Sequence, residues 1–273
     1  MPVATLSNIL ATASKRNAYA IGLVCLAYEE AQAYVAVGEE LDLPIILQTG
    51  PGARAHIPIA HWGQMFRDLA ERAAIPVALH LDHGQSLQDC QAALDAGFSS
   101  VMYDGSRNPI KENVETSASV VEAAKAYDAS VEVEVGHVGY QGDPRGDMTA
   151  PDDLALMARA LPDAAIAISV GNVHLQESKD AVINWDQLAA CRAAVKNPFV
   201  VHGGSGVSLP DRSRMAEEFG VRKINIGTEL RQAAGQAMKI QLEQDFDKLK
   251  ALKASANAAR SVCLDLMKQA WQV

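Results

Sequence analysis

The stretch VALHLDHG, residues 77–84, ends an apolar run with an acid beside an imidazole. An aspartate can serve as a general acid or base, and a histidine can bind a metal ion through a ring nitrogen. One interpretation is a buried strand that happens to end in two polar residues. The other is a strand that delivers Asp82 and His83 to a site, and the residues at the ends of the other apolar runs decide between the two.

Three histidines lie at or just after the ends of apolar, β-rich runs: His83, His174 and His202. Each of them taken alone is more often a hydrogen-bonding residue than a metal ligand. Three neutral imidazoles that leave one coordination position open are typical of catalytic zinc sites. Their shared placement predicts that the three histidines bind one divalent metal ion.

Carboxylates accompany these histidines. Asp104 ends one β-rich run, whereas Glu132 and Glu134 alternate along another and therefore share one face of it. A carboxylate directed into a protein interior needs a cation, a metal ion or a hydrogen-bond donor. We expect Asp104 beside the metal ligands and Glu134 near the metal, as an alternate ligand or behind the ligands. The role of Glu132 stays open, with a buried ion pair to Lys223 or Arg222 as the alternative.

Two glycine-rich turns, HGGSG at 202–206 and NIGT at 225–228, follow the last two β-rich runs. Glycine lets the backbone approach an anion closely, and hydroxyl side chains add donors. Such turns at the ends of the last two strands of a barrel often bind phosphate. Metal ligands and a phosphate site together predict a small phosphorylated substrate. The candidates for substrate binding are Thr49, Gly203, Ser205, Gly227 and Thr228.

Eight β-rich runs must position these side chains, and amphipathic helical segments separate them. Apolar strands that alternate with helices predict a parallel sheet that is buried on both faces. Eight such units favour a single (β/α)8 barrel, in which active sites lie at the carboxyl ends of the strands. An open, doubly wound sheet is the alternative. The eight runs are 18–24, 44–49, 76–81, 99–104, 130–135, 165–170, 199–202 and 223–226.

No linker-like or low-complexity stretch divides the chain, so we expect residues 1–273 to form a single α/β barrel domain with C-terminal helices over 229–273. The 33 acidic and 24 basic residues give a net charge of −9, which argues against a nucleic-acid partner. No apolar run has the roughly 20 residues needed to cross a bilayer. Four scattered cysteines without paired spacing indicate a cytoplasmic protein without disulfides.

With these residues in place, the chain resembles the zinc-dependent class II ketose-bisphosphate aldolases, most specifically in VALHLDHG itself. The resemblance implies that Asp82 is the catalytic acid or base and that His83 binds zinc. The GNVH and HGGSG motifs likewise imply that His174 and His202 are zinc ligands. Asn225 resembles an asparagine that holds the enediolate part of the substrate, and Asp104 and Glu134 resemble residues near the metal.

The resemblance implies a lyase of carbohydrate metabolism that cleaves a phosphorylated ketose reversibly into a dihydroxyacetone-phosphate-like fragment and an aldehyde. We expect one catalytic Zn²⁺, with room for a monovalent cation, and a homodimer or homotetramer. A metal-dependent sugar-phosphate isomerase or epimerase is one alternative. A non-catalytic phosphosugar-binding barrel subunit is another, although such a protein would be expected to lose zinc ligands, and this chain keeps all three.

The chain departs from the family around the far side of the expected pocket. Tyr140 replaces the second glycine of a loop motif, and Gly142 stands where the family has a glutamate assigned to proton transfer. The residues that could substitute for that glutamate are His137, Tyr140, Asp143 and Asp147. Arg231 and Arg260 are candidates for binding a second phosphate. These departures predict a modified or shorter ketose phosphate at least as readily as fructose 1,6-bisphosphate.

Overall fold

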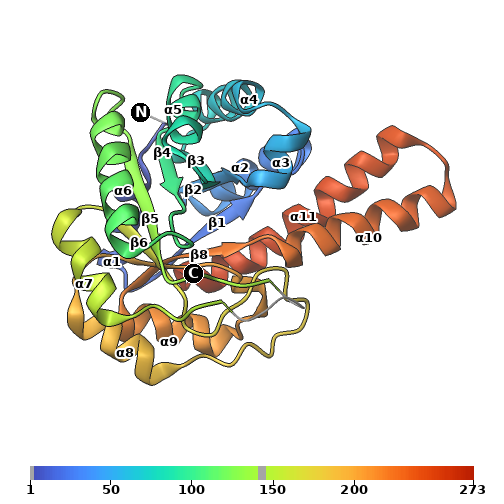
Figure 1. The fold of residues 1–273 in the computed structure, drawn as a ribbon. Helices are drawn as coiled ribbons and strands as arrows, with labels where there is room; N and C mark the ends of the chain where they lie inside the picture. Colours follow the sequence, from blue (N-terminus) through green and yellow to red (C-terminus); the bar gives the residue numbers. More distant parts are fainter. Residues whose placement is uncertain (1–2, 141–145) are drawn as a thin grey trace.

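A computed structural model describes residues 3–140 and 146–273 of the chain, and it contains a closed, eight-stranded parallel barrel (Figure 1). Each strand pairs with its neighbours in sequence, and β8 pairs with β1 to close the sheet. The closed barrel confirms the predicted fold and excludes the open, doubly wound sheet. The strands are β1 (Ala20–Val24), β2 (Ile45–Thr49), β3 (Val77–Gly84), β4 (Ser100–Tyr103), β5 (Ser130–Val135), β6 (Ala165–Ile168), β7 (Phe199–Val201) and β8 (Val221–Ile226).

Helices lie between the strands and cover the outside of the barrel (Figure 1). Polar side chains begin several of them: Ser86, Asn184 and Ser208 each accept a hydrogen bond from a backbone N–H in the first turn. The helices between strands are α2 (Tyr28–Leu41), α3 (Pro51–His56), α4 (Ile59–Arg72), α5 (Leu87–Asp95), α6 (Ile110–Lys125), α7 (Pro151–Ala160), α8 (Trp185–Ala194) and α9 (Leu209–Phe219).

The first helix, α1 (Leu6–Lys15), closes the amino-terminal end of the barrel. It contacts β1, β3, β5 and β8, and its buried side chains include Leu6 and Ile9. Because this end is closed, the barrel opens at the carboxyl ends of the strands. The chemistry-bearing side chains gather at that open end.

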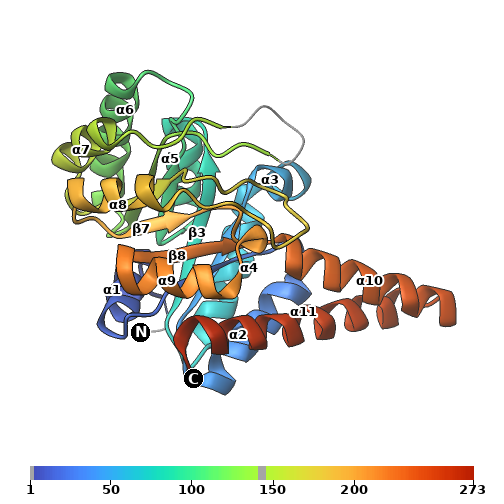
Figure 2. The same cartoon turned by 90° about the horizontal axis from the view of Figure 1, so that it is seen from below.

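Two long C-terminal helices, α10 (Thr228–Gln244) and α11 (Lys248–Trp271), form a pair that extends away from the barrel (Figures 1 and 2). The second helix returns to the barrel and packs against α2 and β1, where Cys263 and Trp271 are buried. Among the described residues, no helix is both long enough and apolar enough to cross a membrane.

The interior of the barrel holds a buried polar cluster beneath its open end. Lys223, Glu132 and His80 are each fully buried. The Lys223 ammonium lies 2.7 Å from Glu132 Oε2 and 3.1 Å from His80 Nε2, and His80 Nδ1 lies 2.8 Å from Ser100 Oγ. Glu132 therefore forms the buried ion pair that was its alternative interpretation, and Lys223 is its partner. Arg222 instead donates to the main-chain carbonyls of Ala216 and Val221.

Candidate active site

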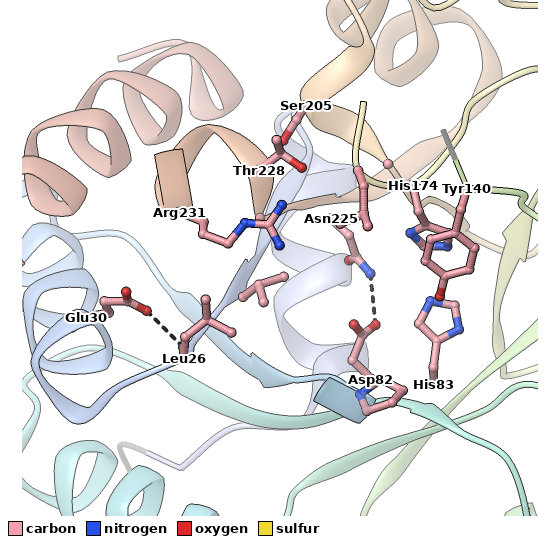
Figure 3. Close-up of a pocket in the computed structure, with 15 residues that line it drawn as sticks. Leu26, Glu30, Asp82, His83, Tyr140, His174, Ser205, Asn225, Thr228 and Arg231 are labelled. Carbon is pink, nitrogen blue, oxygen red and sulfur yellow. Dashed lines mark hydrogen bonds between the residues drawn. The ribbon is translucent and has the colours of Figure 1, made fainter. Parts of the chain in front are cut away.

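The open end of the barrel contains a cavity of about 170 Å³ that is lined by side chains from both the strand ends and the surrounding loops (Figure 3). Asp82, His83 and His174 lie on one side of it. Gly203, Ser205, Asn225, Gly227 and Thr228 also line the cavity. The structure therefore places these predicted residues around one cavity. His202, Asp104 and Glu134 do not line it, but each has a side-chain atom within 4 Å of a ring nitrogen of His83.

The carboxyl end of β3 breaks the normal alternation of a strand. Asp82 and His83 are consecutive, so a regular strand would point them to opposite faces, yet both line the cavity. The pairing register with β4 shifts between Leu81 and Gly84, and His83 has a φ of 50° in the left-handed region. Bulges of this kind re-aim side chains next to active sites, and the left-handed conformation costs a non-glycine residue roughly 1–2 kcal/mol.

Two histidine nitrogens face each other across a short distance at the centre of the site. His83 Nε2 lies 2.8 Å from His202 Nδ1. The opposite ring nitrogens donate to carboxylates, since His83 Nδ1 is 2.8 Å from Asp104 Oδ2 and His202 Nε2 is 3.0 Å from Glu132 Oε1. These partners orient the two rings so that the remaining nitrogens face each other, and when His83 is deprotonated both facing nitrogens offer lone pairs. Lone pairs at this separation repel each other unless a cation lies near both.

His174 completes this group, because one ligand atom from each of the three histidines lies within 4.8 Å of the others. Glu134 Oε2 is buried and, in the described part of the chain, has no hydrogen-bond partner. Glu134 also forms a second group with His83 and Asp104, in which one ligand atom from each residue lies within 4.8 Å of the others. The residues present therefore fit a divalent metal ion, with nitrogen donors and an unsatisfied carboxylate oxygen at one place.

The charges around the histidines favour a cation. Burial lowers the pKa of His174 and of His202 well below the usual value. Both imidazoles are therefore neutral, and each can offer the lone pair of a ring nitrogen to a metal ion. Burial alone would also lower the pKa of His83, but the surrounding carboxylates Asp82, Asp104 and Glu134 outweigh it and raise that pKa to about 10. The carboxylates thus stabilise positive charge at the position where the ring nitrogens converge.

Asp82 lies beside this group without belonging to it. Its Oδ1 accepts a hydrogen bond from Asn225 Nδ2 at 3.1 Å (Figure 3), and its Oδ2 lies 3.3 Å from where a Cβ on Gly50 would be. The amide of Asn225 orients the carboxylate, and the absence of a side chain at Gly50 leaves room for it. Asp82 can therefore accept a proton from a molecule in the cavity.

The glycine-rich turns form another wall of the cavity (Figure 3). A Cβ on Gly203 would lie 2.1 Å from the carbonyl oxygen of Val173, and Gly203 has a φ of 63°, so only glycine fits there. Thr228 begins α10, whose amino terminus opens beside the cavity, and the backbone N–H of Glu229 donates to Ser205 Oγ at 3.3 Å. An amino terminus with hydroxyl donors suits a phosphate group.

The remaining candidates fall into two groups. Tyr140 lines the cavity and stacks on His174, with ring centroids 4.8 Å apart, and Arg231 also lines it (Figure 3). Thr49, Asp147, His137 and Arg260 do not line it. Thr49 is fully buried, His137 lies 3.2 Å from Ser106 Oγ, and Arg260 pairs with Glu40. Gly142 and Asp143 lie outside the described residues.

Sequence reasoning missed several residues near the cavity. Leu26, Glu30 and Pro51 line it, and the side chain of Arg54 bonds to the backbone beneath it. Leu26 and Glu30 follow β1 at the same open end as the predicted residues, so the strand-end rule itself could have nominated them. Arg54 carries no such signal, because its role depends on the backbone of a different strand.

Comparison with known proteins agrees with this geometry. Residues 4–272 match the family described as fructose-bisphosphate aldolase class-II. The chain belongs to the class-II fructose-bisphosphate aldolase family. The resemblance stated from the sequence motifs is therefore confirmed.

Two related sequences and a solved structure match nearly the whole chain. The fructose-bisphosphate aldolase of Mycoplasma pneumoniae is 35% identical in an alignment 272 positions long, and the match covers 93% of each chain. That of Staphylococcus epidermidis is 34% identical over 260 residues, covering 90% of this chain and 88% of the relative. The YdjI aldolase from Escherichia coli K12 has a TM-score of 0.85 at 26% identity, with 98% and 97% of the two chains covered.

A more distant solved structure shows the same barrel. Fructose-bisphosphate aldolase from Campylobacter jejuni has a TM-score of 0.84 at 21% identity, and the match covers 98% of this chain and 95% of the other. Such a likeness supports the fold alone.

Proposed function

We propose that this chain is a metal-dependent aldolase that reversibly cleaves a phosphorylated ketose into a dihydroxyacetone-phosphate-like fragment and an aldehyde. The observation that carries the proposal is the placement of Asp82 next to a compact group of three histidine nitrogens, of which those of His83 and His174 belong to residues that line the same cavity as Asp82. A second wall formed by the glycine-rich turns supports a phosphorylated substrate. Membership in the class-II aldolase family supports the same reaction.

Asp82 is the base in this proposal. It removes the proton from the hydroxyl group that becomes the aldehyde, the adjacent carbon–carbon bond breaks, and the electron pair stays on the three-carbon fragment as an enediolate. Asn225 orients the carboxylate of Asp82 through its amide. In this proposal Asn225 also holds the fragment that retains the electrons. A positioned general base contributes about 10²–10⁴-fold to such a step.

His83, His174 and His202 would hold one divalent metal ion, which we propose is Zn²⁺. When bound, the ion supplies Lewis-acid stabilisation of the negative charge that cleavage leaves on the three-carbon fragment. Asp104 and Glu132 orient two of the imidazoles through their distal nitrogens. Glu134 is the alternate ligand, because one of its buried oxygens has no partner among the described residues.

The substrate phosphate is held by Gly203, Ser205, Gly227 and Thr228 in this proposal, through backbone N–H groups, hydroxyls and the start of α10. Interactions remote from the reacting bond position it for Asp82, so binding energy there contributes to cleavage. The loop-built rim of the cavity carries Leu26, Leu175 and Tyr140, which support an aldehyde fragment other than glyceraldehyde 3-phosphate.

We also propose that the chain acts as a single barrel domain with residues 229–273 as its C-terminal helices, in a cytoplasmic homodimer or homotetramer. The α10–α11 pair supports self-association, because it extends from the barrel and exposes Phe246 and Leu249. Four buried free cysteines support a reducing compartment. Light scattering of the purified protein measures the oligomeric state directly.

The experiment that tests the proposed function is a cleavage screen of zinc-loaded protein against ketose mono- and bisphosphates. Triose phosphate is followed by coupled NADH oxidation, and the released aldehyde is measured separately. Equal amounts of both products are expected. Conversion of the ketose without either product would indicate an isomerase or epimerase, and binding without conversion would indicate a phosphosugar-binding protein.

A further inference from the structure

The guanidinium of Arg54 joins the end of β3 to the end of β2. Arg54 Nη1 donates to the carbonyl of Asp82 at 2.6 Å and to that of Thr49 at 3.3 Å, and Nη2 donates to the carbonyl of His83 at 3.1 Å. In the described part of the chain, the hydrogen bonds of this side chain all go to main-chain carbonyls. One half-buried side chain therefore holds the backbone of both Asp82 and His83.

These two carbonyls belong to the segment where β3 departs from regular strand geometry. The register with β4 shifts there, and His83 adopts a left-handed φ of 50°. This departure is what allows two consecutive side chains to face the same cavity. A strained conformation of this kind persists only where its surroundings hold it in place.

The support for Arg54 is itself rigid. It lies on the short helix α3, whose residue Ala53 accepts a hydrogen bond from the indole N–H of Trp62 at 3.2 Å. Trp62 is fully buried, and Pro51 at the start of α3 lines the cavity. A guanidinium presents several donors in a fixed plane, whereas a lysine ammonium is a point charge that cannot reproduce this fork.

We propose that Arg54 is a positioning residue that holds the bulged end of β3, so that Asp82 and His83 face the cavity together. For Asp82, whose position matters for catalysis, the inference rests on the proposed function. For His83, whose position matters for metal binding, the inference does not require that the chain cleave any sugar. Arg54 thereby couples the base and the metal site through their shared backbone.

The test uses zinc affinity, measured by competition with a chromogenic chelator, together with kcat and KM of the full-length protein. Arg54→Lys should weaken zinc affinity and lower kcat by roughly 10–100-fold each, the range seen when an outer partner of a metal ligand is removed. KM for the ketose phosphate should change little, because the phosphate turns lie on another wall. In Arg54→Ala, added guanidinium ion should restore zinc affinity and kcat saturably, whereas urea should not.

Arg192→Lys is the matched control. The half-buried guanidinium of Arg192 also bonds to main-chain carbonyls, those of Val195 and Asn197, but at the opposite end of the barrel. That variant should lower the thermal unfolding midpoint while zinc affinity and kcat stay within about twofold of the wild-type values.

The proposal is overturned if Arg54→Lys behaves like Arg192→Lys, with a lower unfolding midpoint but unchanged zinc affinity and kcat. It is also overturned if guanidinium fails to rescue a folded Arg54→Ala variant. A wild-type protein that cleaves none of the ketose phosphates would contradict the proposed function alone. The zinc affinities of the same variants would still decide the role of Arg54.

Discussion

The metal-binding side of the cavity and its far side are built in different ways. On the metal side, the imidazoles of His83 and His202 each have a carboxylate bonded to the distal nitrogen, and both are buried at strand ends. The far side is the loop-built rim of the cavity, where Leu26, Tyr140 and Leu175 are 37%, 41% and 48% exposed and Tyr140 reaches across to stack on His174.

This difference separates chemistry from recognition. Strand ends that are fixed by a closed barrel can hold reacting groups to within fractions of an ångström, whereas loops can vary without disturbing them. We therefore expect substitutions on the metal side to abolish cleavage and substitutions on the far side to reorder substrates. The following predictions test that contrast, from the largest expected effect to the smallest.

Replacement of a metal ligand should have the largest effect. His202→Ala removes one of the facing nitrogens, so the variant should lose most of its bound zinc and nearly all cleavage activity. Mass spectrometry of metal content and the coupled assay measure the two losses. Full zinc occupancy in a folded His202→Ala protein would remove this histidine from the site.

Replacement of the base should separate metal binding from catalysis. Asp82→Ala should keep zinc, because the carboxylate lies beside the ligand group, and should lose about 10²–10⁴-fold in kcat. Near-normal turnover by this variant would exclude Asp82 as the base.

Replacement of a carboxylate behind a ligand should have an intermediate effect. Asp104→Asn keeps the shape of the side chain but removes the charge that accepts from His83 Nδ1, so zinc affinity should fall by roughly 10–100-fold. Asp147→Asn is the control, because Asp147 is exposed and does not line the cavity. Equal zinc affinities for the two variants would contradict the assignment of Asp104.

Replacement on the far side should change selectivity instead of metal binding. Arg231 is exposed at the edge of the cavity. Arg231→Met should therefore lower kcat/KM for ketose bisphosphates by about tenfold or less, equivalent to 1.4 kcal/mol, and change monophosphates less. Zinc affinity should not change, and a large loss of zinc would show that the two sides are not independent.

Substrate preference tests the same contrast in the wild-type protein. Because the far side departs from the family pattern, modified or shorter ketose phosphates should match or exceed fructose 1,6-bisphosphate in kcat/KM. Steady-state comparison of these substrates decides the point. A preference for the bisphosphate of tenfold or more would show that the departure at Tyr140 does not alter recognition.

The sequence was sufficient for the barrel and for most of the metal side, because alternating strands and helices place all strand ends at one edge. The alternation of side chains along a strand also predicts a contact that the sequence analysis left open. Lys223 and Asn225 are two residues apart on β8 and so share a face, which makes Lys223, and not Arg222, the partner for Glu132. The choice between the two was therefore available from the pattern.

Other features depend on backbone geometry that no pattern reveals. A strict alternation would have sent either Asp82 or His83 away from the cavity, and only the bulge with its left-handed residue brings both to one side. The position of Thr49 at the end of β2 suggested a substrate contact, but its side chain is buried and does not line the cavity. Its backbone carbonyl contacts Arg54 instead.

The most direct test of the central claim is a titration of zinc into chelator-stripped wild-type protein while carbon–carbon cleavage is followed. Three histidines around one position predict that activity rises linearly with zinc and reaches a plateau at one equivalent per chain. Cleavage that is independent of zinc, or that reaches its plateau at a different stoichiometry, would contradict a single catalytic ion held by His83, His174 and His202.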